Sequence, residues 1–149
     1  MKKQRNNYNF LEGYNFLNVL LRDINVRGNN MINKINLKKT VDSALDLFQY
    51  IGIGKLNDHV LNVLQAENRT LDFHVHEKSD ELFYVIEGTF EMKLDNGIIL
   101  MEQGDIIIIP KGIRHRPICK SLVKCLLIEL DGTLNNENTG GTYKKVTTY

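Results

Sequence analysis

The sequence carries no excess of charge of one sign. Its 19 lysines and arginines are nearly balanced by 18 aspartates and glutamates, which leaves a formal net charge of +1. Such a chain has no general electrostatic field to gather polyanions or anionic lipid. Long hydrophobic runs are lacking near the N-terminus too, because Asn18 interrupts Phe16–Leu21 and Arg22 ends it. This run is too short for a signal peptide or a membrane span, so we expect a cytoplasmic protein with no nucleic-acid or membrane partner.

Cysteine is also scarce. The two cysteines, Cys119 and Cys125, do not form a C-x-x-C pair. Without a secretion signal, both are predicted to be free thiols in a reducing compartment. With 149 residues, of which 42% are hydrophobic and 25% charged, the chain is long enough for one domain with a real core.

The first third of the chain has a helical periodicity. Residues 1–30 place apolar side chains three or four positions apart, which predicts a helical N-terminal extension. Residues 31–52 repeat this spacing up to Gly52, which supplies a stop, and predict a helical lead-in. The apolar positions are Phe10, Tyr14, Leu17, Leu21 and Ile24 in the first segment, and Leu37, Val41, Ala44 or Leu45, and Phe48 in the second.

Beyond residue 52 the period changes to two. Short β-rich runs alternate with glycine-containing turns, and Asp-Asn-Gly at 95–97 is typical of a tight hairpin. This pattern predicts an all-β domain over 53–131, a closed barrel or a two-sheet jelly roll that hides its edges. The polar segment 132–149 is predicted to be a loosely held tail. The predicted strands are His59–Glu67, Thr70–His76, Glu81–Glu87, Thr89–Leu94, Ile98–Met101, Asp105–Ile109, Arg114–Pro117 and Leu122–Leu130.

Two histidines one residue apart mark a candidate metal site. On a strand, His74 and His76 project from the same face with Cα atoms about 6.6 Å apart, so both imidazoles can meet one ion. After a short polar turn, Glu81 opens the next strand and can return a carboxylate toward the same point. A fourth ligand, His115, begins a strand after a second strand-and-turn segment. By contrast, His59 has no partner at such a spacing and is predicted to be a surface or strand histidine.

These residues fall in two motifs by which the chain resembles the cupins. The first cupin motif, a glycine, five residues, H-x-H, three or four residues, Glu, six residues and Gly, is matched by His74, His76, Glu81 and Gly88. The second, Gly, five residues, P-x-G, two residues and His, is matched by Gly104, Pro110, Gly112 and His115. Two positions depart from the pattern. Asn68 replaces the leading glycine, where asparagine is the next-best residue at positive φ, and Cys119 replaces a closing asparagine.

The resemblance covers roughly residues 53–131 and implies a double-stranded β-helix, the jelly roll of the cupin barrel. It is closest to small single-domain cupins labelled mannose-6-phosphate isomerase-like, as in "DELFYVIEG", "GIRHRP" and "LLIELDGTLN". Similar proteins begin near Met31, which implies that residues 1–30 are an atypical extension. Cupins of this size commonly pair, so the resemblance also implies a homodimer.

The donor set indicates which cofactor to expect. Three imidazoles and one carboxylate, with no thiolate, suit a divalent transition metal, namely Fe, Mn, Ni, Co or Zn. An octahedral ion would keep two positions open for water or a small-molecule ligand. With a divalent ion the site carries a net charge of about +1, which would attract an anionic ligand.

Strand alternation predicts which side chains surround the metal. If Glu81 points inward, Phe83 and Val85 also point inward and form an apolar wall. By the same rule Arg114 and Arg116, which flank His115, point away from the metal. Cys119 could reach the cavity and act as a thiol, but we favour a small buried hydrophobe at this position.

Three functions remain open at this point. The first is a metal-dependent enzyme acting on a small molecule, with dioxygenase-type oxidation as the best guess and a sugar isomerase-like activity as the alternative. Oxidation is favoured because no motif supplies a recognisable general acid or base, and a redox metal with dioxygen needs fewer such groups. The second is a non-catalytic module that binds a small ligand or a metal. The third is a purely structural metal site.

Overall fold

The structure of this chain is a computed structural model that describes residues 23–26, 30–135, 139 and 141–149. Its contacts divide the chain into two units, Met1–Lys34 and Ile35–Tyr149. The described part of the first unit is an antiparallel hairpin of β1 (Asp23–Val26) and β2 (Asn30–Asn33). No helix within the described ranges has the length and apolar character needed to cross a membrane.

The helix predicted for residues 1–30 lies mostly outside the described residues. The prediction is wrong for its last member, Ile24, which lies in β1 opposite Ile32 of β2. Both side chains are β-branched, and Val26 in the same strand is too, which favours a strand over a helix.

The helical lead-in predicted for 31–52 is correct only over α1 (Leu37–Asp42). Asn36 caps this helix, because its side-chain oxygen accepts a hydrogen bond from the backbone N–H of Lys39 at 3.0 Å. The helix ends at Asp42 with Ser43 as its C-cap, and the chain then enters a strand of the large sheet at residue 49. Gly52, predicted to end a helix, lies within this strand next to a register shift. Pairing with strands on both sides therefore outweighs the helical periodicity.

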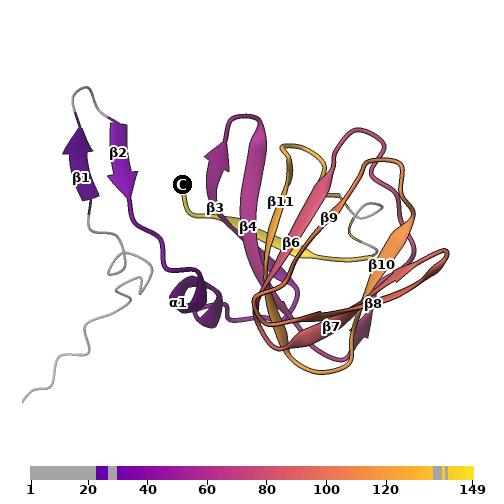
Figure 1. The fold of residues 1–149 in the computed structure, drawn as a ribbon. Helices are drawn as coiled ribbons and strands as arrows, with labels where there is room; N and C mark the ends of the chain where they lie inside the picture. Colours follow the sequence, from indigo (N-terminus) through magenta and orange to yellow (C-terminus); the bar gives the residue numbers. More distant parts are fainter. Residues whose placement is uncertain (1–22, 27–29, 136–138, 140) are drawn as a thin grey trace, which may run out of the picture. The chain divides into compact units, whose positions relative to one another are not determined.

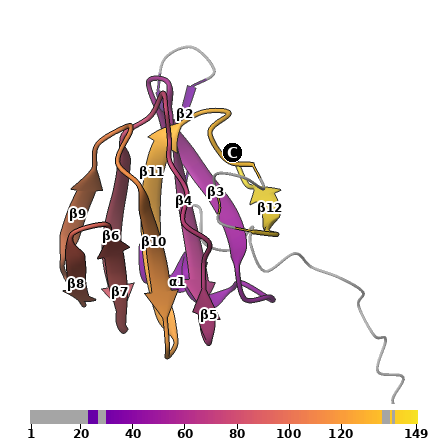
Figure 2. The same ribbon diagram turned by 90° about the vertical axis from the view of Figure 1, so that its right-hand side faces the viewer.

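Two sheets form the barrel of the second unit (Figures 1 and 2). The larger sheet has the order β12-β3-β4-β11-β6-β9, and the smaller has the order β5-β10-β7-β8. All neighbours are antiparallel except β12 and β3, which are parallel. The strands are β3 (Gln49–Leu56), β4 (His59–Ala66), β5 (Arg69–Thr70), β6 (Glu81–Glu87), β7 (Thr89–Leu94), β8 (Gly97–Glu102), β9 (Ile106–Ile109), β10 (His115–Cys119), β11 (Val123–Leu130) and β12 (Lys144–Thr147). The all-β jelly-roll prediction is confirmed.

Two predicted segments differ from the structure. The strand predicted over 70–76 is reduced to β5 and an isolated bridge at His74. The C-terminal tail was expected to be loose, but its β12 pairs with the edge of β3, and Leu134 and Tyr143 pack against the interior core. This pairing satisfies backbone groups of β3 that an edge strand would leave open, so the expectation of a loose tail is wrong for residues 144–147.

Apolar side chains form two clusters in this unit. One lies between the two sheets and includes Phe48, Tyr50, Phe83, Phe90 and Leu127. The other lies on the outer face of the large sheet, where α1 covers it with Val41. The inner cluster is where strand alternation directs the predicted wall, and it contains Val85 as well as Phe83. The functional site must therefore be sought between the sheets.

Candidate metal centre

The structure brings the four predicted ligands together. One donor atom from each of His74, His76, Glu81 and His115 lies within 4.8 Å of the others. All four side chains are buried, with exposed fractions of 8%, 3%, 4% and 0%. They come from separate segments, because His74 and His76 precede β6, Glu81 opens β6 and His115 opens β10.

Backbone pairing fixes the distance between the two motifs. His74 and His115 form an isolated antiparallel bridge, in which each N–H donates to the other residue's carbonyl, at 3.0 and 3.1 Å. The turns that carry the ligands are also tied, since the Lys111 N–H donates to the Asp80 carboxylate at 2.9 Å. Asp80 thereby joins the loops of both motifs.

Backbone carbonyls also orient two of the imidazoles. The Nδ1 of His74 lies 2.9 Å from the Asp72 carbonyl oxygen, and the Nδ1 of His115 lies 2.9 Å from that of Ile113. A carbonyl oxygen can only accept, so both Nδ1 atoms carry the hydrogen. The Nε2 atoms are then the ones left to hold a metal.

Glu81 sits at the centre of the cluster. Its Oε2 accepts hydrogen bonds from the Nε2 of His115 at 2.9 Å and of His76 at 3.1 Å. Burial would raise the pKa of Glu81, but these hydrogen bonds and the charges behind them lower it. Burial likewise opposes protonation of His115, yet its hydrogen bond to Glu81 raises the His115 pKa, whereas burial lowers that of His74. A buried carboxylate here is thus stabilised by positive charge.

The donor set fits a divalent cation. A metal ion at the common point would take the place of the hydrogens that Glu81 now accepts, and it would supply the positive charge that a buried carboxylate requires. The Nδ1 of His76 is buried and has no hydrogen-bond partner among the described residues. This ring is therefore held less firmly than the other two.

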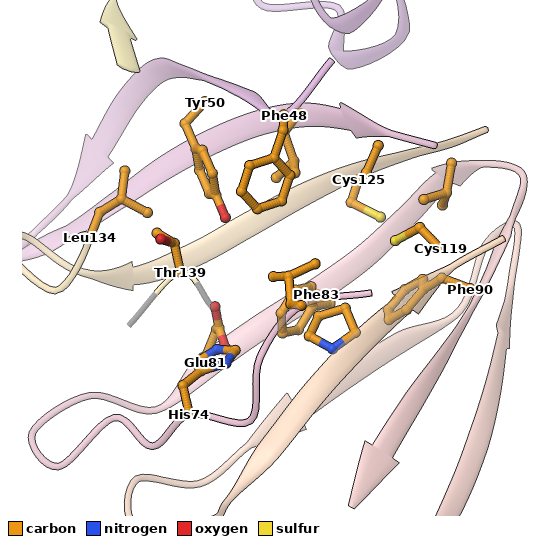
Figure 3. A pocket seen from close by; sticks show the side chains of 15 residues that line it. Phe48, Tyr50, His74, Glu81, Phe83, Phe90, Cys119, Cys125, Leu134 and Thr139 are labelled. Carbon is orange, nitrogen blue, oxygen red and sulfur yellow. The ribbon is translucent and has the colours of Figure 1, made fainter. Parts of the chain in front are cut away.

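A cavity adjoins the cluster inside the barrel (Figure 3). His74 and Glu81 lie on one side of it, and Phe90, Cys119 and Cys125 lie on another. Its described lining is Phe48, Tyr50, Leu64, Ala66, Leu71, His74, Glu81, Phe83, Phe90, Pro117, Cys119, Val123, Cys125, Leu134 and Thr139. The predicted inward direction of Phe83 is thereby confirmed.

Other predictions about neighbouring side chains are also confirmed. Arg114 and Arg116 lie outside the cavity, with their guanidinium carbons 3.9 and 4.5 Å from the ring centre of Phe73. Cys119 and Cys125 are free and buried, and burial raises the Cys119 pKa to about 11. Such thiols are poor nucleophiles.

Sequence reasoning missed three buried polar residues of the barrel. Glu129 is 1% exposed, and burial together with the charge of Glu81 raises its pKa to about 8. Burial, followed by the charges of Glu81 and Glu129, raises the pKa of Tyr50 well above its usual range. Asn62 is fully buried on β4. The signal for Glu129 was present in the sequence, because it continues the inward alternation of Val123, Cys125 and Leu127 along β11.

Comparison with known proteins gives one family and one curated relative. The model of the cupin domain family matches residues 62–130. The curated relative is the uncharacterized protein YdbB of Bacillus subtilis, which is 32% identical over 82 residues. The match covers 54% of this chain and 72% of YdbB.

Solved structures share the fold. A cupin-2 domain protein of Shewanella frigidimarina is 28% identical with a TM-score of 0.61, over 64% of this chain and 93% of that chain. Protein NMB1881 of Neisseria meningitidis is 23% identical with a TM-score of 0.59, over 66% and 99%. Hydroquinone 1,2-dioxygenase of Sphingomonas sp. TTNP3, solved with 4-hydroxybenzoate bound, is 19% identical with a TM-score of 0.54, over 76% and 77%. The last two likenesses show the fold alone.

Proposed function

Because the chain belongs to the cupin family, we propose that it binds a divalent transition metal through His74, His76, Glu81 and His115 and uses it to act on a small molecule. The observation that carries this proposal is the convergence of the four donors within 4.8 Å. The carbonyl-bound Nδ1 atoms of His74 and His115 support it, because they direct the Nε2 atoms to the common point.

A metal held there supplies Lewis acidity and, if it is redox-active, the chemistry of dioxygen. The protein holds the ligands in place and keeps the site away from bulk water, since all four are buried. We favour oxidation as the reaction class. The described cavity lining offers few proton-transfer groups, because burial raises the pKa values of Tyr50, Cys119 and Cys125 still further above the neutral range.

A sugar isomerase-like activity is the second candidate. Glu129 favours it, because a buried carboxyl group with a pKa of about 8 can hold and release a proton near neutral pH. A non-catalytic module that binds a metal or a small ligand would use the same site without either reaction.

Two statements about partners belong to the same proposal. An anionic head group on the ligand would be attracted by the net positive charge of the metal with Glu81. A homodimer is supported by the edge strand β9, where Ile106 and Ile108 are 60% and 58% exposed. Sizing of the full chain in solution tests the dimer, and a monomer at all concentrations would reject it.

Elemental analysis of the full chain, purified without added metal, tests the metal site. We expect about one equivalent of transition metal per chain, and loss of that metal in the His74→Ala/His115→Ala double variant. His59→Ala is the matched control, because His59 lies on β4 outside the cluster, and it should keep the metal. Iron together with oxygen uptake would support oxidation, and zinc would support isomerisation or a structural role. A chain that holds no metal, and gains none from Fe, Mn, Ni, Co or Zn, would reject the proposal.

A further inference from the structure

The cavity beside the metal ligands is polar on one side and apolar over most of its wall. The described polar groups that line it are His74, Glu81, Tyr50 and Thr139. In Figure 3 the hydroxyl of Tyr50 points into the cavity, and Thr139 lies between Tyr50 and Glu81. The remaining lining is apolar apart from the two thiols. A molecule that fills this space therefore needs one polar end and an apolar body.

Aromatic rings make up much of the apolar wall. Phe83 and Phe90 lie with their ring centres 5.9 Å apart, and Phe48 contacts Tyr50 edge to face at 5.5 Å. Such rings present both faces and edges to a guest, and another ring packs well against them. The wall thus favours a flat or ring-shaped body over an extended polar chain.

The backbone conformation of Phe48 is independent support for ligand binding at this wall. Its φ of 56° lies in the left-handed region, which a bulky side chain rarely adopts. The surrounding structure holds it there, because its N–H donates to the Gln65 carbonyl at 2.7 Å and the Arg69 guanidinium carbon lies 3.4 Å from its ring centre. A backbone conformation that costs free energy and directs a ring into a cavity next to a candidate site is typical of functional positions.

Phosphorylated compounds do not suit this lining. No lysine or arginine is among the described residues that line the cavity. A phosphate group packed against the wall, away from the metal, would lose its water without gaining the charge-assisted hydrogen bonds that arginine or lysine normally provides. Sugars fit poorly for a related reason, because most of their hydroxyl groups would face carbon atoms.

We propose that the cavity binds a small ring compound, aromatic or alicyclic, whose single oxygen head group points to His74 and Glu81 while its ring packs on Phe48, Phe83 and Phe90. The head-group part of this inference rests on the proposed function, because the metal would receive that oxygen. The ring-binding part depends only on the apolar wall.

Binding of simple probes to the full chain tests the proposal. Phenol, toluene and glucose 6-phosphate are titrated into the metal-loaded protein, and binding is followed by NMR. We expect phenol to bind at least about tenfold more tightly than glucose 6-phosphate. Phe90→Leu should weaken phenol binding about threefold to tenfold by loss of ring contacts. Phe73→Leu is the matched control, because Phe73 lies outside the cavity under Arg114, and it should have no effect.

Phe48→Leu serves as a second wall variant if Phe90→Leu does not fold, and circular dichroism checks each variant. Equal binding of phenol and glucose 6-phosphate, or equal effects of the cavity variant and Phe73→Leu, would overturn the inference even if the metal is present. The preference for phenol over toluene should disappear in His74→Ala/His115→Ala, and its persistence there would overturn the assigned head-group position. An unsubstituted chain that takes up no metal but still binds phenol through the wall would reject the proposed function and leave the ring-binding part in place.

Discussion

The two parts of the barrel interior contribute to stability in opposite ways. The apolar part, which includes Phe83, Phe90, Val123 and Cys125, is buried and packed between the sheets. Each such side chain stabilises the fold by about 1.5–3 kcal/mol. The polar part consists of the four candidate ligands together with Glu129 and Asn62. Several of its polar atoms have no partner within the described part of the chain, and each of these costs about 1–3 kcal/mol.

This difference shows which part is shaped by folding and which by function. A barrel selected only for stability would continue the apolar packing around Glu81. The polar part instead stays buried and incompletely paired, at a cost that the apolar part offsets. The comparison predicts that damage to the apolar part destabilises the protein, whereas an apolar or neutral substitution in the polar part stabilises it.

Gly88→Ala should disrupt the packing of the apolar part and give the largest change in the free energy of unfolding. Gly88 has a φ of +84°, and a Cβ on it would lie 2.3 Å from the backbone oxygen of Leu122, next to Val123 of the cavity wall. Because the clash is with backbone, the strands must move apart, and we expect a loss of more than about 4 kcal/mol in the free energy of unfolding. Denaturant unfolding of the full chain measures it.

Gly104→Ala is the control for that experiment. Gly104 also has a positive φ, +93°, but a Cβ there would meet no atom within 4 Å. It should cost only the backbone strain, about 1–2 kcal/mol. Similar losses in the two variants would show that strain, and not the contact with Leu122, makes Gly88 necessary.

The four ligands of the polar part were easier to predict from the sequence than the cavity wall. The ligands lie in two short segments whose spacing predicts that they converge, although the strand expected for His74 and His76 is reduced to a bridge at His74. Strand alternation then predicts the directions of Phe83 and Arg116. The cavity wall draws on residues from Phe48 to Thr139, and nothing local marks them as neighbours. Phe48 illustrates this limit, because its helical spacing predicted a helix, and only the pairing of β3 with β4 places it in the barrel.

The prediction of a loose C-terminal tail failed for a similar reason. Its polar composition indicates a loose tail, but β12 gains its place by pairing with β3, almost a hundred residues earlier in the chain. Strand pairing of this kind depends on an open backbone edge, which the sequence of the tail does not encode.

Glu129→Gln should raise the free energy of unfolding by an amount that depends on pH. The folded pKa of Glu129 is about 8, against an ordinary value of 4.5. Between these values the carboxyl group is protonated in the folded protein and ionised in the unfolded chain, so the free energy of unfolding falls as pH rises. Glutamine has no carboxyl group to ionise, so the free energy of unfolding of the variant does not fall in this way. In metal-free protein it should nearly equal the original chain near pH 4.5 and exceed it by roughly 4 kcal/mol at pH 8.

Thermal or denaturant unfolding across this pH range measures the difference between the two proteins. Glu102→Gln, an exposed position on β8, is the matched control and should give no comparable pH-dependent gain. A Glu129→Gln difference that stays constant from pH 4.5 to 8 would mean that Glu129 is ionised in the fold and belongs with the paired carboxylates.

Asn62→Leu should give the smallest effect, again a gain. Asn62 is fully buried, and both its amide nitrogen and its amide oxygen have no hydrogen-bond partner among the residues that the structure describes. Leucine has a similar size and no polar atoms, so we expect the free energy of unfolding to rise by about 1 kcal/mol. Gln65→Leu on the same strand is the control, because Gln65 donates to the Ala44 carbonyl at 3.3 Å, and its loss should bring no gain. If Asn62→Leu is instead destabilised as much as Gln65→Leu, the Asn62 amide has a partner in the folded protein, and the polar part costs less than its unpaired atoms indicate.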